Sequence, residues 1–129
     1  MSAMPTPDIE IYLQHTSRDA VIAWLAARFP ASANTPPRPA GKKQWRLVLQ
    51  DGEQQIPVLI IEEASPGFTS VWFNSPHTPW PDDMVCAREA HAHFHTEVRA
   101  TAGSWQEGDD PDLWWRIDDQ GEGLMQWPD

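Results

Sequence analysis

Residues 113–127 read LWWRIDDQGEGLMQW, and this stretch guides the interpretation of the rest of the chain. Two short segments rich in β-forming residues flank a polar turn that contains glycine, which is the pattern of a β-hairpin. An earlier segment partly echoes it, because Trp45–Leu47 (WRL) lies over Trp115–Ile117 (WRI). The earlier turn, Asp51-Gly52, also falls where the later turn falls. The echo predicts a chain built twice from one unit.

Working outward from the hairpin, the spacing of apolar residues predicts two helices and several strands. One helix is expected from a capping box at Thr16 to a stop at Pro30, and a second from Pro81 to about His93. Residues 31–42 contain three prolines and are expected to form an extended loop. Strands are expected near residues 9–14, 45–50, 56–61, 69–74 and 97–101, and in both segments of the hairpin.

The expected fold is a single α+β domain over residues 1–129, with residues 1–7 as a flexible tail. The element order is β-α-β-β-β-α-β-β-β, so we expect a two-layer sandwich in which two helices cover one face of a mostly antiparallel sheet. Each half contains a βαββ core, which makes a pseudo-duplication possible. This order resembles that of gyrase-inhibitor-like bacterial effector-binding domains. No motif of that family is present, so the resemblance implies no function.

The charge balance narrows the kinds of partner. Nine basic and nineteen acidic residues give a net charge of −10, which disfavours nucleic acids and anionic membranes. Four of the nine basic residues fall between Arg38 and Arg46, whereas the chain after residue 105 is strongly acidic. The single cysteine cannot form an internal disulfide, and neither a signal peptide nor a membrane span is evident. A cytoplasmic location is expected.

Eight tryptophans are the most unusual feature of the composition. Indole rings bury large apolar areas while their N–H groups need partners, so they suit core edges, pockets and interfaces. Because side chains alternate along a strand, Trp114 and Trp115 are expected on opposite faces of the sheet, and the outward one marks a surface for binding. The candidate ligand or interface residues are Trp72, Trp80, Trp105, Trp114, Trp115 and Arg116.

The segment CAREAHAHFH, residues 86–95, is the main candidate for metal chemistry. Imidazole and thiolate groups bind zinc and copper, which makes His91, His93 and His95 candidate ligands. On a helix, however, these three side chains diverge, and histidines at a solvated helix end are the alternative interpretation. Cys86 is expected on the apolar side of the same helix, as a small buried residue.

No catalytic motif is present, so no catalytic residue and no cofactor are expected. The sequence favours a binding module that contacts another protein, or a second copy of itself, through an open sheet face or the acidic C-terminal loops. The alternative is a domain that binds a small molecule or a transition metal, through a tryptophan-lined cleft or the histidine cluster.

Overall fold

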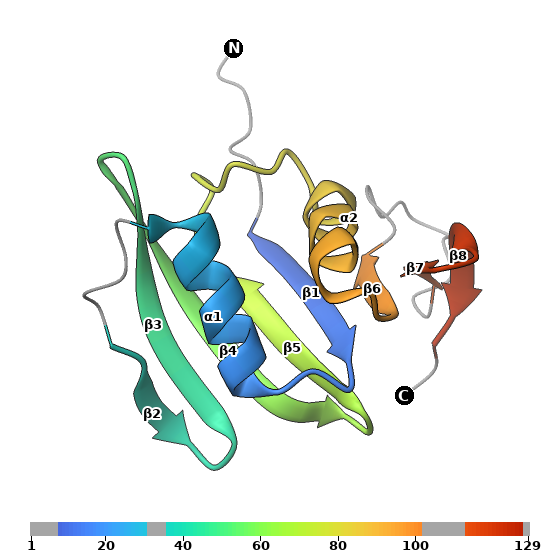
Figure 1. The fold of residues 1–129 in the computed structure, drawn as a ribbon, viewed down its shortest axis with the longest axis horizontal. Coiled ribbons are helices and arrows are strands. Elements are labelled where there is room, and N and C mark those ends of the chain that lie inside the picture. Colours follow the sequence, from blue (N-terminus) through green and yellow to red (C-terminus); the bar gives the residue numbers. More distant parts are fainter. Residues whose placement is uncertain (1–7, 31–35, 102–112, 128–129) are drawn as a thin grey trace.

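The computed structural model describes residues 8–30, 36–101 and 113–127, which form an α+β fold (Figure 1). Two helices and eight strands follow one another in the order β1 (Ile9–Gln14), α1 (Arg18–Arg28), β2 (Arg38–Gly41), β3 (Gln44–Asp51), β4 (Gln54–Ser65), β5 (Phe68–Phe73), α2 (Asp83–Phe94), β6 (Val98–Thr101), β7 (Leu113–Asp118) and β8 (Gly121–Gln126). The expected α+β class with an antiparallel sheet and two helices is confirmed. Neither described helix is long and apolar enough to cross a membrane.

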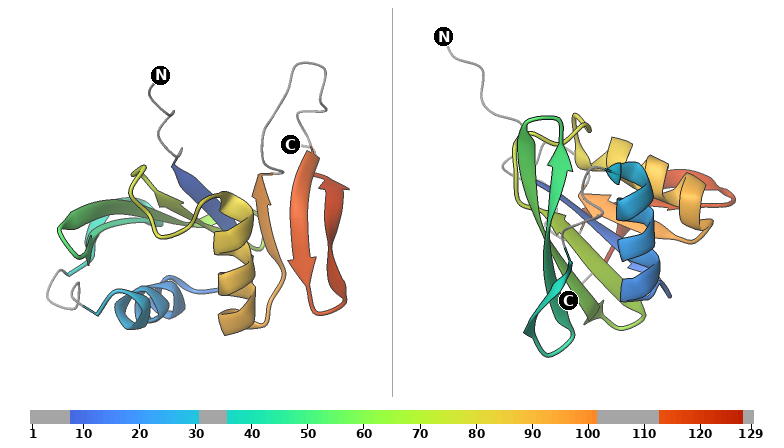
Figure 2. Two further views of the ribbon diagram at one scale, coloured as in Figure 1. Left: turned by 90° about the horizontal axis from the view of Figure 1, so that it is seen from above. Right: turned by 60° about the vertical axis from the view of Figure 1, so that its left-hand side comes forward.

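All eight strands form one sheet in the spatial order β2-β3-β4-β5-β1-β6-β7-β8, and every neighbouring pair is antiparallel. The strand β1 lies near the middle and pairs with β5 on one side and β6 on the other. Both helices lie on the same side of the sheet, as the views from above and from the side show (Figure 2). The opposite side, which we call the outer face, has no described helix over it.

The core lies between the helices and the inner face of the sheet. Alternate residues of β1, namely Ile9, Ile11 and Leu13, are fully buried, as period-2 alternation predicts. Helix α1 contributes Val21, Trp24 and Leu25 to the same core, and α2 contributes Cys86, Ala87 and Ala90. The small residues of α2 permit a close approach to the sheet, where this helix contacts β1, β6 and β7.

The proline-rich segment differs from the expected loop, because residues 38–41 form the strand β2. Pro39 is tolerated there because β2 is an edge strand that pairs only with β3. The other strand proline, Pro57, lies where β4 extends beyond its ladder with β5, which begins at Val58. Its carbonyl accepts from the Asn74 N–H at 2.8 Å, and the missing N–H interrupts no ladder on that side.

The first helix begins one residue later than its capping box predicts. The Ser17 hydroxyl, not that of Thr16, accepts from the backbone N–H of Ala20 at 3.1 Å. The Thr16 hydroxyl instead donates to the Gln14 carbonyl at 3.0 Å, which fixes the turn between β1 and α1.

The two halves of the chain follow different paths through the sheet. After α1, the strands run from the edge at β2 inward to β5, whereas after α2 they run from β6 outward to the edge at β8. The echoed residues still occupy similar places, since Leu47 and Ile117 are both buried on the inner face. The two hairpins are therefore alike locally, but the strand order does not confirm the pseudo-duplication of the chain.

Candidate binding surface on the outer face

A groove of about 360 Å³ lies on the outer face, over strands β2 to β5. The strand register explains its composition, because Arg46, Leu59 and Trp72 are directly opposite one another on three adjacent strands. Val48 and Pro57 form a second opposed pair beside this row. The residues that line the groove include Arg38, Arg46, Val48, Pro57, Leu59 and Trp72.

The groove has an apolar floor and one aromatic wall. Val48 is 37% exposed, which is unusual for a large aliphatic side chain in this molecule, and Leu59 beside it is half-buried. The Trp72 ring is held in place because its indole N–H donates to the carboxylate of Asp8. An apolar surface with a fixed aromatic edge suits an apolar ligand group.

Two arginines form the other side of the groove. Arg38 and Arg46 are both exposed and lie directly opposite each other across β2 and β3. Within the described residues, neither makes an ion pair or a hydrogen bond. The other five arginines each contact a carboxylate, in the pairs Arg18–Asp19 at 3.2 Å, Arg28–Glu89 at 2.9 Å, Arg88–Glu122 at 2.8 Å, Arg99–Glu97 at 2.6 Å and Arg116–Asp118 at 3.6 Å.

A second feature of the outer face is an aromatic cluster over β1, β5 and the C-terminal hairpin. Tyr12, Trp114 and Trp127 contact one another with ring centroids 5.1–5.4 Å apart. The Trp127 ring also packs on Phe68, with the Arg99 guanidinium 4.4 Å from both ring centroids. This packing leaves Trp114 half-buried, so the cluster partly covers its own apolar surface.

The structure places the two consecutive tryptophans as alternation predicts. Trp114 lies in the aromatic cluster of the outer face, and Trp115 packs against the core on the helical side. The Trp115 indole N–H donates to Glu122 at 3.1 Å, and the same carboxylate pairs with Arg88. These bonds lower the pKa of Glu122, with the hydrogen bond from Arg88 as the largest cause.

Trp80, another of the candidate tryptophans, lies in the core instead of on this surface. Trp80 is only 2% exposed and packs against the rings of Trp24, Phe29 and Phe73. Its indole N–H donates to Glu89 at 3.1 Å, so its polar atom is satisfied inside the fold. Trp105 lies outside the described residues.

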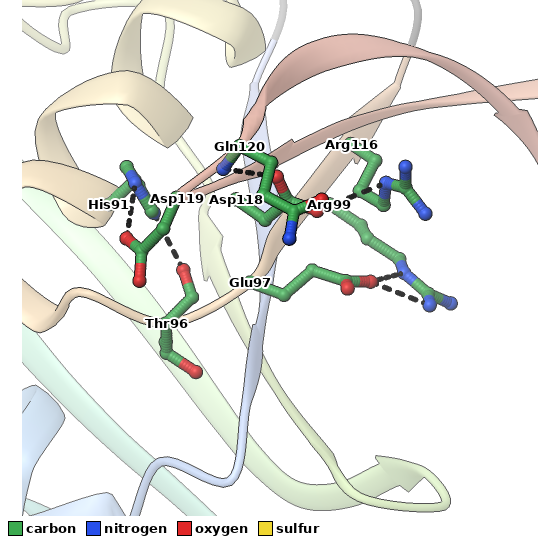
Figure 3. A network of polar contacts seen from close by, with 8 residues as sticks. All are labelled: His91, Thr96, Glu97, Arg99, Arg116, Asp118, Asp119 and Gln120. Carbon is green, nitrogen blue, oxygen red and sulfur yellow. Dashed lines mark hydrogen bonds and ion pairs between the residues drawn. The ribbon is translucent and has the colours of Figure 1, made fainter.

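The three candidate metal ligands point to different surroundings. His91 Nδ1 is 2.7 Å from the Thr96 carbonyl oxygen, and its Nε2 is 3.4 Å from Asp119. Figure 3 shows His91 beside these two residues. The His93 ring packs on Phe94 and Trp24, and His95 ends α2 in a left-handed conformation. In the parts of the chain that the structure describes, no three His, Cys, Asp or Glu side chains come together to hold a metal ion.

The contacts of His91 belong to a polar network that joins α2 to the turn between β7 and β8 (Figure 3). Asp118 accepts from the Gln120 backbone N–H at 2.9 Å and pairs with Arg116, which supports the turn. Cys86, on the same helix, is fully buried, and burial raises the pKa of its thiol well above the ordinary value. Cys86 is therefore a small buried residue of the core.

The sequence interpretation missed most of the groove. It selected Trp72 and noticed the basic cluster around Arg38 and Arg46, but it placed Arg38 in a loop. It gave no role to Val48, Pro57 or Leu59, because an apolar outer face looks the same in sequence as a strand covered on both sides. The available signal was the almost continuous apolar run 56–61, combined with a sequence pattern that predicts only two helices, enough for one face of the sheet.

Comparison with known proteins gave no further guidance, because no family model, curated protein or solved structure matches this chain. The fold and site define it only as an α+β protein with an antiparallel sheet whose outer face carries a groove and an aromatic cluster.

Proposed function

We propose that this protein is a binding module that contacts another protein through the outer face of its sheet. The observation that carries the proposal is the groove, which joins exposed apolar side chains to two arginines that have no ion pair within the described residues, on a face without a described helix. Tryptophan and arginine are enriched among the residues that dominate binding energy in protein interfaces. The aromatic cluster on the same face extends the surface available to a partner.

The proposal is tested by photo-crosslinking in the cells that make this protein. A benzoylphenylalanine residue placed at Val48 or at Met125 puts the reactive group on the outer face, whereas the same residue at Ala26 puts it on the exposed side of α1. We expect adducts from the two outer-face positions and none from Ala26. Adducts from Ala26 alone, or none from Val48 and Met125, would refute binding through this face.

The mass of each adduct identifies the partner class. A mass equal to twice that of the chain indicates a second copy, and any other mass indicates a different protein. Homodimerisation is a prediction that this experiment also tests, and a cytoplasmic location stays a separate prediction.

A small organic ligand is the second candidate, and the groove itself favours it. A volume of about 360 Å³ falls at the lower end of the range for small-molecule sites. If the protein binds a small molecule instead of a protein, crosslinking from Val48 and Met125 should give no protein adducts. Small organic acids should then still shift the indole N–H signal of Trp72. The histidine cluster is the weaker route to a ligand, because its three imidazoles point to different surroundings.

A further inference from the structure

We infer that the groove binds a segment of the partner protein in which a bulky apolar side chain lies close to a carboxylate. This inference rests on the proposed function and names the chemistry of the partner. Its basis is the order of side chains along one row of the sheet: Trp72, Leu59, Arg46 and Arg38 occupy β5, β4, β3 and β2 in turn.

The apolar half of the row defines the first feature of the partner. Leu59 lies between the Trp72 ring and Arg46, with Val48 and Pro57 beside it. An aliphatic or aromatic side chain placed there would cover surface that is now open to water, and the fixed indole ring would provide one wall.

The charged half of the row defines the second feature. Like charges that face each other on neighbouring strands are unfavourable, yet Arg38 and Arg46 occupy such positions, and no acidic side chain among residues 8–30, 36–101 and 113–127 pairs with them. The five other arginines are all paired, in a chain that has more than twice as many acidic as basic residues. A carboxylate from outside would relieve this repulsion and accept charge-assisted hydrogen bonds from two guanidinium groups.

The net charge of −10 would repel an acidic partner at a distance, but this repulsion is screened over about 8 Å at physiological salt. Once the segment is in the groove, the two nearby guanidinium groups determine the sign of the interaction. The other end of the row, at β5 and β1, is acidic. The Asp8 carboxylate accepts the hydrogen bond from the Trp72 indole N–H, and Glu10 on β1 is directly opposite Trp72. The carboxylate of the partner is therefore directed toward β2 and β3, and its apolar group toward β5.

The geometry also sets the spacing within the partner segment. Strands are about 4.8 Å apart, so the centre of the apolar floor and the arginine pair are separated by roughly 5–10 Å. In an extended segment, side chains two residues apart point the same way and lie about 7 Å apart. The preferred segment thus has a bulky apolar residue and a Glu or Asp about two positions from it.

Selection from a random dodecapeptide library displayed on phage, with the full chain immobilised, tests the inference. We expect enrichment of sequences that combine a bulky apolar residue with a nearby acidic one. The double variant Arg38→Ser/Arg46→Ser should bind the selected peptides about tenfold more weakly or worse. The control variant Arg88→Ser removes a positive charge from α2, on the helical side of the sheet, and should change binding less than about twofold.

Three results would overturn the inference: no enrichment, enrichment of sequences without acidic residues, or equal binding by the double variant. Both altered arginines are exposed, so circular dichroism and thermal unfolding should show that the double variant folds. Two alternative occupants have their own signatures. If decanoate or indole-3-acetate shifts the Trp72 indole signal while no peptide binds, the occupant is a small acid. If the chain self-associates and the double variant does not, the occupant is a second copy.

The outcomes separate this inference from the proposed function. Photo-crosslinks from Val48 without acidic-apolar enrichment would leave protein binding in place and reject only the chemistry assigned to the groove. Loss of both the crosslinks and the enrichment would reject the two together.

Discussion

Replacing Arg46 with glutamate should stabilise the protein while removing its ability to bind an acidic segment. The variant turns an opposed pair of like charges, Arg38 and Arg46, into an opposed pair of unlike charges on β2 and β3. Cross-strand charge pairs contribute roughly 0.2–1 kcal/mol with either sign. Because both side chains are exposed, solvent limits the combined gain in the free energy of unfolding to about 0.5–1 kcal/mol. For a chain of this size, such a gain raises the melting temperature by about 2–4 °C.

Urea unfolding followed by tryptophan fluorescence measures this gain, and the same experiment in about 1 M NaCl should reduce it because the Debye length falls to about 3 Å. The control is Arg88→Glu, which replaces the ion pair between Arg88 and Glu122 with two neighbouring carboxylates and should lower stability. If Arg46→Glu unfolds at lower urea than the parent chain, or if salt leaves its gain unchanged, the argument from unpaired arginines is wrong. A gain with lost peptide binding would show that Arg46 serves binding at the expense of stability.

Three further predictions concern the fold. Burial, with added repulsion from Asp83 and Asp8, raises the pKa of Glu10. The charged form of Glu10 therefore destabilises the folded state above the unfolded pKa of about 4.5. In urea titrations, Glu10→Gln should increase the stability at pH 7 and have no effect near pH 3, where Glu10 is protonated in both states. The pKa of Glu122 is lowered, so its stabilisation is fully present above about pH 4.5 and is lost as the pH falls through the lowered pKa. Glu122→Gln should lower the urea midpoint at pH 7, and the difference from the parent chain should shrink as the pH is lowered below 4.5. Leu25→Ala should cost about 2–5 kcal/mol in the same assay because Leu25 is fully buried, whereas the exposed Ala26→Ser should cost only about 0.5 kcal/mol; equal costs would contradict the packing of α1.

Local patterns in the sequence predict most of the secondary structure. The alternation of Ile9, Ile11 and Leu13 identifies β1 and its buried face, and the same rule places Trp114 and Trp115 on opposite sides of the sheet. The sequence did not predict the edge strand β2, because prolines are usually excluded from strands. Pro39 is accepted there only because β2 lies at the edge of the sheet.

The candidate site was less accessible to sequence reasoning, since it depends on pairing between distant strands. Arg46 and Trp72 become part of one row only through the registers of β3, β4 and β5. Trp80 shows the opposite case, because its proline-flanked segment has no periodicity from which burial could be inferred. Its packed environment arises because the fold brings Trp24 of α1, Phe73 of β5 and Glu89 of α2 around the same ring.

The position of β1 has a consequence for how the molecule folds. The two parts of the sheet, β2–β5 and β6–β8, share no direct ladder and are joined only through β1, which precedes all the other described strands. During synthesis, one edge of β1 therefore stays unpaired until β5 has been made, and the other edge stays unpaired until β6 has been made. Such long-range closure predicts slow folding, and it leaves a β-prone segment with an unpaired edge on the nascent chain until β6 has been synthesised.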